Sequence, residues 1–297
     1  MLSKKDQNIP TSFQESRTEI LFDTGKEGFN DKGLSMTRNL RNMSHKALVV
    51  IPSRLASTRL PNKPLADICG KPLIVHVWDK AVKANVGPVI VACGDAEIMQ
   101  VIKSFGGEAI LTDPRLPSGT DRIKVAADLY DPHQSYDSII NVQGDLPTLD
   151  PALLEEALLP LTDPFVDIAT LATVIKDPFE LKNENFVKVA LSLHQDATVG
   201  RALYFSRSPI PWGPGPHYHH VGLYAYRREA FNRFVSLPVN CLEKQESLEQ
   251  LRALADGMRI DVKVVKTKAL FGVDTPADLA KAIQIMSESY PLQSRSS

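Results

Sequence analysis

Residues 47–65 read ALVVIPSRLASTRLPNKPL, and this stretch decides the fold class. Its first five residues, 47–51, are a short β-rich apolar run, which is typical of a parallel strand buried on both faces. The prolines at positions 52, 61 and 64 keep the segment that follows extended. We therefore expect a buried strand and then a polar loop outside its carboxyl end, where α/β sheets bind ligands.

The same alternation continues toward the middle of the chain. Strands are predicted at 88–92, 108–111 and 138–142, and helices at 72–85, 95–105, 120–130 and 152–159. Asp95 has the position of an N-cap, and Asp150 precedes Pro151 in the same way. Strands that alternate with helices predict a parallel sheet covered on both faces.

The pattern changes after about residue 165. Strands are predicted at 166–175, 187–193, 202–205 and 221–226 with fewer helices between them, and the proline-rich residues 208–216 form a loop. Helices at 228–234 and 247–256, a strand at 260–265 and a last helix from 275 to about 287 follow. We interpret residues 46–289 as one α/β domain with a mixed-sheet insertion at about 165–235.

The two ends of the chain lack this periodicity. Residues 1–45 are rich in polar and charged side chains and cannot bury enough surface to offset their ordering entropy, so we expect a disordered extension there. Residues 290–297 form a C-terminal tail.

Charge and composition exclude several classes of protein. The 297 residues include 34 Lys and Arg against 35 Asp and Glu, which argues against a nucleic-acid-coating or membrane-surface protein. The apolar stretches are far shorter than the ~20 residues that a bilayer requires. Three scattered cysteines (69, 93 and 241) suit ordinary thiols in a reducing cytoplasm, rather than a disulfide framework or a zinc site.

Three cations follow the first strand, namely Arg54, Arg59 and Lys63. Arginine clamps phosphate oxygens in pairs and lysine supplies a point charge, so this loop suits a triphosphate. It does not have the spacing of a Walker A loop. A solvated basic loop is the alternative, and the position of the loop after the first strand favours the phosphate site.

Two aspartates complete the candidate chemistry. Asp145 ends the segment 141–145 after the fourth strand, where a carboxylate can hold Mg²⁺ together with phosphate oxygens, and Gln143 offers both donors and acceptors. Asp274 either caps the last helix or meets Asp145 in space and shares the metal. A plain turn aspartate remains the alternative for Asp145.

Seven blocks of this chain resemble, in order, those of the 3-deoxy-D-manno-octulosonate (KDO) cytidylyltransferases, the CMP-KDO synthetases of lipopolysaccharide synthesis. The blocks are VIPSRLASTRLPNKPL (50–65), SGTDR (118–122), NVQGD (141–145), YFSRSPIPW (204–212), HVGLYAY (220–226), ESLEQLR (246–252) and GVDTP (272–276). They cover about residues 46–289. The resemblance implies a nucleotide-diphospho-sugar transferase-like three-layer α/β sandwich, Rossmann-like and similar to glycosyltransferase A.

The resemblance also implies a reaction and a set of residues. The anomeric hydroxyl of KDO attacks the α-phosphate of CTP, giving CMP-KDO and pyrophosphate. Arg54, Arg59, Lys63, Asp145 and Asp274 would be catalytic, and the two aspartates would bind Mg²⁺. The residues implied for CTP are Pro52, Ser53, Arg54, Leu55, Arg59, Lys63, Ser118 and Gln143, and those for the sugar are Gln143, His220, Tyr224, Glu246 and Gln250.

Further expectations come from the same resemblance. It implies a cytoplasmic homodimer formed through the 165–235 region. The charge balance and the short apolar stretches already argue against nucleic acid and membrane as partners. Glu246 and Gln250 stand four residues apart, so we expect both on one side of a single helix. Two features depart from the family pattern: Leu146 stands where many members carry Glu, and the loop before His220 is shorter than in some relatives.

Other activities remain open at this point. A synthetase for another CMP-activated sugar acid, such as neuraminate or an amino-KDO analogue, would use the same core, because small substrate differences are beyond sequence interpretation. A glycosyltransferase is disfavoured because residues 144–146 carry only one carboxylate and lack a D-x-D motif. A nucleotide-binding regulator without catalysis is disfavoured by the cations and both aspartates.

Overall fold

The computed structural model describes residues 46–57, 59–267 and 272–289. The expectations for 1–45 and 290–297 therefore lie outside the described residues. The first strand, β1 (Ala47–Ser53), is buried along nearly its whole length, and it pairs in parallel with β4 (Val89–Cys93) and β6 (Ser138–Asn141). β4 in turn pairs in parallel with β5 (Glu108–Leu111). The predicted parallel sheet of the first half is confirmed.

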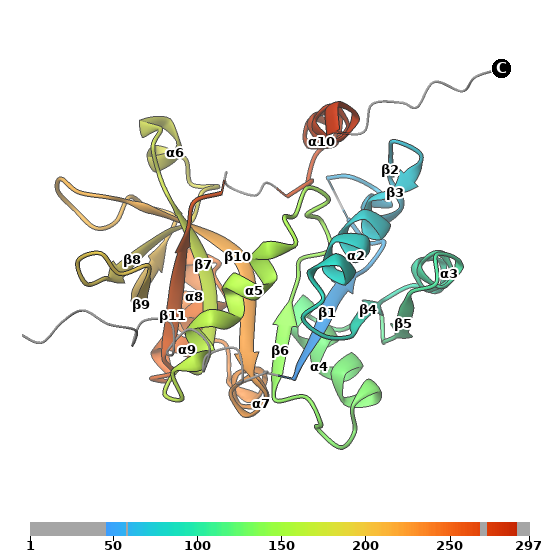
Figure 1. Ribbon diagram of the computed structural model, residues 1–297, viewed down its shortest axis with the longest axis horizontal. Coiled ribbons are helices and arrows are strands. Elements are labelled where there is room, and N and C mark those ends of the chain that lie inside the picture. Colours follow the sequence, from blue (N-terminus) through green and yellow to red (C-terminus); the bar gives the residue numbers. More distant parts are fainter. Residues whose placement is uncertain (1–45, 58, 268–271, 290–297) are drawn as a thin grey trace, which may run out of the picture. The chain divides into compact units, whose positions relative to one another are not determined.

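The second half of the chain extends the same sheet. Its strands are β7 (Ile168–Val174), β8 (Lys188–Ser192), β9 (Val199–Ser206), β10 (Tyr218–Arg227) and β11 (Ile260–Val265). In the described residues the nine strands have the order β5-β4-β1-β6-β10-β7-β11-β9-β8. β10 is antiparallel to both β6 and β7, whereas β11 is parallel to β7 and antiparallel to β9. The sheet is thus mixed and continuous, and β10 joins its two halves (Figure 1).

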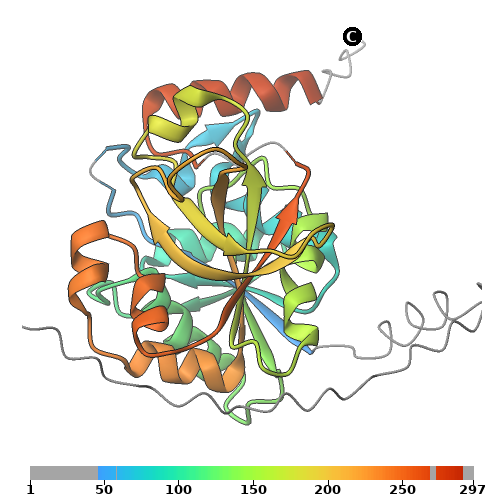
Figure 2. The same cartoon turned by 90° about the vertical axis from the view of Figure 1, so that its left-hand side faces the viewer.

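Helices cover both faces of this sheet. One core packs against α2 (Leu73–Ala84), α3 (Ala96–Ser104), α5 (Ala152–Leu158) and α10 (Pro276–Ser289). The other packs against α4 (Gly119–Tyr130), α7 (Arg228–Ser236) and α9 (Gln250–Ala255). Figure 2 shows the twist of the sheet, with the yellow-to-red strands rotated relative to the blue-to-green ones. The predicted α/β class is confirmed.

Short elements complete the described part of the chain. They are a 3-10 turn η1 (Lys63–Leu65), the small hairpin β2 (Asp67–Ile68) and β3 (Lys71–Pro72), a 3-10 turn η2 (Leu159–Thr162), and the helices α6 (Pro178–Lys182) and α8 (Cys241–Glu246). Within these residues, no helix has the length and apolar character needed to cross a bilayer.

The predicted helix 247–256 is wrong at its start. α8 ends at Glu246 because Ser247 has a left-handed backbone, with φ 53°, and α9 begins only at Gln250. Glu246 and Gln250 therefore belong to different helices, and their spacing does not place them on one helix face. A left-handed backbone is uncommon for serine, and the local sequence does not predict it.

Candidate active site

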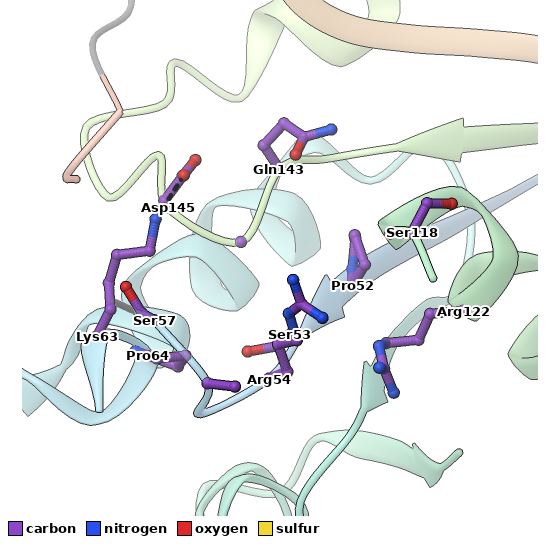
Figure 3. Close-up of a pocket in the computed structure, with 13 residues that line it drawn as sticks. Pro52, Ser53, Arg54, Ser57, Lys63, Pro64, Ser118, Arg122, Gln143 and Asp145 are labelled. Carbon is purple, nitrogen blue, oxygen red and sulfur yellow. Dashed lines mark hydrogen bonds and ion pairs between the residues drawn. The ribbon is translucent and has the colours of Figure 1, made fainter. Parts of the chain in front are cut away.

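A cavity of about 250 Å³ opens at the carboxyl ends of β1 and β6. Its lining residues come from the end of β1 and the loop after it, from the start of α4, and from the loop after β6. They are Pro52, Ser53, Arg54, Ala56, Ser57, Lys63, Pro64, Ser118, Gly119, Arg122, Gln143, Gly144 and Asp145. Lys63 and Asp145 lie at one side, and Ser118 and Arg122 at the other (Figure 3). The cavity thus lies where the sheet topology predicts a ligand.

Gly144 lets the two strand-end loops pack backbone against backbone. A Cβ at this position would lie 2.7 Å from the carbonyl oxygen of Pro52. Any side chain would therefore push the loop after β6 away from β1 and widen the floor of the cavity.

Lys63 joins the two aspartates that the sequence singled out. Its Nζ lies 2.9 Å from Asp145 Oδ2 and 2.9 Å from Asp274 Oδ1, and Arg59 Nη2 lies 3.0 Å from Asp274 Oδ2. Burial lowers the pKa of the Lys63 ammonium, but Asp145 and Asp274 more than offset it, so the pKa lies above its ordinary value. Lys63 is therefore charged at neutral pH, and Asp145 and Asp274 meet in space.

The start of α10 leaves the carboxylate of Asp274 free for this contact. Asp278 accepts hydrogen bonds from the Thr275 N–H and hydroxyl and from the Asp274 N–H, and its own N–H donates to Thr275 Oγ1. This capping box makes Thr275 the N-cap, so the interpretation of Asp274 as the cap is wrong. The Val273 N–H donates to the carbonyl oxygen of Asp145 at 3.0 Å and holds the two segments together.

The donor set at this point fits a magnesium ion. Two carboxylates converge on one ammonium, and Mg²⁺ commonly takes one or two protein carboxylates and completes its shell with phosphate oxygens and water. Within the described residues no group of three or more His, Cys, Asp and Glu side chains could hold a metal ion. A ligand set made of these two aspartates therefore needs the substrate to complete it.

The residues expected at the nucleotide divide into two groups. Pro52, Ser53, Arg54, Lys63, Ser118 and Gln143 line the cavity. Leu55 and Arg59 are not among its described lining residues, because the side chain of Leu55 packs against the core and Arg59 pairs with Asp274. Leu146 is 7% exposed and belongs to the core.

Arg122, the last residue of the SGTDR block, also lines the cavity. It is only 2% exposed, and its guanidinium donates to the Thr112 hydroxyl and to the carbonyl oxygens of Asp113 and Pro114. Its place within the SGTDR block was the available signal.

His220 and Tyr224, both expected on the sugar side, lie within an aromatic row on β10. The His220 ring centroid is 5.3 Å from that of Tyr224 and 5.0 Å from that of Phe205, and Nε2 lies 3.0 Å from Thr170 Oγ1. Burial lowers the pKa of His220 to about 3 and raises that of Tyr224. Both side chains are therefore neutral at physiological pH. Tyr224 is paired with Asn141, two residues before Gln143.

Glu246 and Gln250 have different surroundings. Glu246 accepts hydrogen bonds from the Ser206 hydroxyl at 2.8 Å and from the Arg207 N–H at 3.0 Å, whereas Gln250 is 6% exposed at the start of α9.

Glu249, next to Gln250, was not among the candidate residues predicted from the sequence. Its Oε2 accepts a hydrogen bond from the Thr120 hydroxyl at 2.7 Å, which ties α9 to the first turn of α4. Burial raises the pKa of this carboxyl. Only its membership of the ESLEQLR block could have indicated it.

Because His219 and His220 are buried, we expect the protein to lose stability in weak acid. Burial, together with the Lys188 charge, lowers the pKa of His219 to about 4, and burial lowers that of His220 to about 3. Below pH ~6.5 these histidines bind protons in the unfolded chain but remain neutral in the folded one. The free energy of unfolding therefore falls by about 1.4 kcal/mol per pH unit for each histidine.

Urea denaturation at pH 7.5, 6.5, 5.5 and 5.0 measures this effect. His219→Gln should show a shallower decline below pH 6.5 than the unaltered chain. Equal slopes would contradict the assignment of His219 as a neutral, buried histidine.

Comparison with known proteins agrees with this geometry. The cytidylyltransferase family profile matches residues 48–260. The 3-deoxy-manno-octulosonate cytidylyltransferase of Paramagnetospirillum magneticum is 55% identical over 235 residues, covering 79% of this chain and 95% of the relative. That of Parvibaculum lavamentivorans is 55% identical over 242 residues, covering 82% and 93%.

Solved structures give the same result. A CMP:2-keto-3-deoxy-manno-octonic acid synthetase complexed with CTP is 40% identical, with a TM-score of 0.76, over 82% of this chain and 99% of that one. A 4-diphosphocytidyl-2C-methyl-D-erythritol synthase from Anaerococcus prevotii, 11% identical with a TM-score of 0.56, shares the fold. This chain belongs to the cytidylyltransferase family and, within it, to the 3-deoxy-manno-octulosonate cytidylyltransferases.

Proposed function

We propose that this chain transfers the cytidylyl group of CTP to the anomeric hydroxyl of KDO, forming CMP-KDO for lipopolysaccharide biosynthesis and releasing pyrophosphate. The observation that carries the proposal is the Asp145–Lys63–Asp274 cluster at the edge of a cavity that Arg54 also lines. The curated relatives that match over 90% of their own length bear the name of this activity.

The reaction forms one bond and breaks one. The anomeric oxygen of KDO bonds to the α-phosphorus of CTP, and the bond from that phosphorus to the oxygen bridging to the β-phosphate breaks. Pyrophosphate leaves with the electron pair, and the hydroxyl proton passes to solvent or to Asp274, which is the candidate acceptor. Such a transfer depends on positioning and on stabilisation of charge.

The cations of the loop after β1 provide that charge. We assign Arg54, Arg59 and Lys63 to the triphosphate, since guanidinium groups and an ammonium are the natural partners of phosphate oxygens. Arg59 pairs with Asp274, and Lys63 pairs with both Asp145 and Asp274, so these two cations would bind phosphate directly beside the two aspartates. Pro52, Ser53, Leu55, Ser118 and Gln143 complete the proposed CTP-binding set, and all of these except Leu55 line the cavity.

Mg²⁺ is the cofactor that the donor set suits. Asp145 and Asp274 would hold it. A bound Mg²⁺ neutralises charge at phosphorus and lowers the pKa of a coordinated hydroxyl or water.

The sugar acid is assigned to the region between the end of β6, β10 and the α8–α9 segment. Gln143, His220, Tyr224, Glu246 and Gln250 remain its proposed partners, and Glu249 joins them on its position beside Gln250. A polyhydroxylated acid needs many donors and acceptors, which this set supplies. His220 is 8% exposed, and Tyr224 is partly buried against the core that α4, α7 and α9 cover.

The fold subclass and the location follow from the same assignment. A nucleotide-diphospho-sugar transferase-like three-layer sandwich is supported by the mixed sheet with a core on each face. The cytoplasm is the proposed compartment, because the reaction consumes CTP.

Release of pyrophosphate tests the proposed function directly. The protein is mixed with CTP and Mg²⁺, and KDO, an amino-KDO analogue or N-acetylneuraminate is added, with a control lacking sugar and a control containing EDTA. Release only with KDO and metal is expected. Release with another sugar acid alone would overturn the proposed substrate, and release that persists in EDTA would overturn the proposed cofactor.

A homodimer formed through residues 165–235 is the proposed assembly. Large apolar side chains of this segment are exposed, notably Trp212 at 99%, Phe179 at 72% and Leu203 at 58%. Exposed apolar surface of this kind marks protein interfaces. Light scattering should therefore give about twice the chain mass of 32.8 kDa.

Replacement of two of these side chains tests the interface. The double variant Leu203→Asp, Trp212→Ser should give the mass of one chain at micromolar concentration, because a charge in an apolar contact costs more than such a contact contributes. Leu129→Asp is the matched control, since Leu129 is 63% exposed on α4, outside the segment. A monomeric unaltered chain, or a double variant that stays dimeric, would contradict the proposal.

A further inference from the structure

Asp95 has the backbone of a helix cap but does not act as one. It occupies the N-cap position of α3 with φ −136° and ψ 141°, yet its side chain makes no capping hydrogen bond. An Asp in this role usually stabilises its helix by accepting a hydrogen bond from an N–H of the first turn. Its Oδ2 instead accepts a hydrogen bond of 2.7 Å from the N–H of Leu55, forty positions earlier in the chain.

This hydrogen bond joins the two loops that follow the carboxyl ends of β1 and β4. Leu55 follows Arg54, which lines the cavity, and Asp95 follows β4, which pairs with β1. The Gly94 N–H also donates to the Ser53 carbonyl oxygen at 2.8 Å. The backbone on both sides of Arg54 is therefore fixed to the turn at residues 94–95, and this turn supplies no residue that lines the cavity.

Arg54 and Arg122, the two arginines of the cavity, both pack against Gly94. A Cβ on Gly94 would lie 3.0 Å from Arg122 Nη1 and 3.1 Å from Arg54 Cβ. Both contacts are closer than ordinary van der Waals separations, so both arginines pack directly over this glycine. The turn at 94–95 is thus the common support of Arg54 and Arg122.

The negative charge of Asp95 also affects Arg54 and Arg122 electrostatically. Burial and the nearby Arg54 charge lower the pKa of the Arg122 guanidinium, whereas Asp95 raises it. The hydrogen bonds of Arg122 go to a hydroxyl and to carbonyl oxygens, so the Asp95 carboxylate offsets part of the repulsion between two neighbouring cations.

We propose that Asp95 is a positioning residue of the nucleotide pocket, which gives up its capping hydrogen bond in order to fix the backbone after Arg54 through the Leu55 N–H. It acts through Arg54 on the phosphates and does not touch the sugar acid. This inference rests on the proposed function, because it names CTP as the ligand whose binding Asp95 supports.

Three substitutions separate the contributions of Asp95. Asp95→Asn keeps an oxygen acceptor for Leu55 and a residue suited to capping, but it removes the charge. Asp95→Ser is too short to reach Leu55, yet it is a good N-cap. Asp95→Ala lacks both functions. Asp177→Ala is the matched control, since Asp177 caps α6 through the Phe179 N–H and α6 supplies no residue of the cavity.

Calorimetric titration with CTP, kinetics with both substrates and hydrogen exchange of the Leu55 amide test the proposal. Asp95→Ala and Asp95→Ser should bind CTP about tenfold more weakly, with KM for KDO unchanged within about twofold. Asp95→Asn should stay within about threefold of the unaltered protein. The Leu55 amide of the ligand-free Ala and Ser variants should exchange faster, although the Ser variant melts no lower than the Ala variant.

Three results would overturn the proposal. The first is CTP affinity in Asp95→Ala equal to that of the unaltered protein. The second is a rise in KM that is as large for KDO as for CTP. The third is a CTP affinity that follows the melting temperature across the Ala, Ser and control variants, which would assign Asp95 a purely structural role. If the unaltered protein itself did not bind CTP, the proposed function would fail as well, and this distinguishes the two failures.

Discussion

Asp145→Asn should lower the rate of pyrophosphate release by on the order of 1,000-fold at saturating CTP and KDO. Asparagine has the shape of aspartate and can still accept a hydrogen bond from Lys63 Nζ, while the backbone bond from Val273 to residue 145 does not depend on the side chain. The fold should therefore be retained. The loss of rate should arise because two carboxylates are needed to hold Mg²⁺ beside the phosphates, and this variant keeps only one.

Asp150→Asn is the matched control for this variant. Asp150 lies in the same connection, is exposed and accepts a hydrogen bond from the Ala152 N–H at the start of α5. Its turnover should stay within about twofold of the unaltered protein, as is usual for exposed substitutions. Turnover of Asp145→Asn near that of the control would remove Asp145 from the proposed metal pair.

Lys63→Met should lower kcat/KM for CTP by about 100-fold and should also change how the ligand-free protein responds to Mg²⁺. Methionine keeps the unbranched apolar stem of lysine and removes the ammonium. Asp145 and Asp274, which now share Nζ, would then face each other with Arg59 still paired to Asp274. Their repulsion should lower the melting temperature, and a divalent cation should relieve it.

Melting curves with and without millimolar Mg²⁺ measure this second effect without any turnover. Mg²⁺ should raise the melting temperature of Lys63→Met more than that of the unaltered protein. Lys71→Met is the control, because Lys71 pairs with Asp79 on α2, away from the cavity. An equal Mg²⁺ response in all three proteins would contradict the proposal that Asp145 and Asp274 hold the metal.

The sequence identifies those parts of the fold and of the site that depend on local patterns. Hydrophobic runs and end signals placed the strands and most helices, as at Asp150, whose side chain meets the Ala152 N–H as an N-terminal signal should. Because parallel strands bring their carboxyl ends to one edge, the loops after β1 and β6 could be expected to carry Arg54, Lys63 and Asp145 to one place.

Features that depend on distant contacts could not be read from the chain. The left-handed Ser247 separates Glu246 from Gln250, and serine has no intrinsic preference for this backbone. Asp95 has the local pattern of a cap, yet its partner comes from the preceding strand-end loop. Asp274 could be either a cap or a ligand until Thr275 and Asp278 proved to form the cap.

The central place of β10 has a consequence for how the chain is made. The strands β1, β4, β5 and β6 are complete once the ribosome has passed Asn141, but their neighbour β10 begins only at Tyr218. Until then β6 is an open edge, and its later pairing must close a long loop, which is intrinsically slow. A polypeptide truncated after Asp145 but before Tyr218 would carry Arg54, Lys63 and Asp145 but would expose a strand edge that other nascent chains can join.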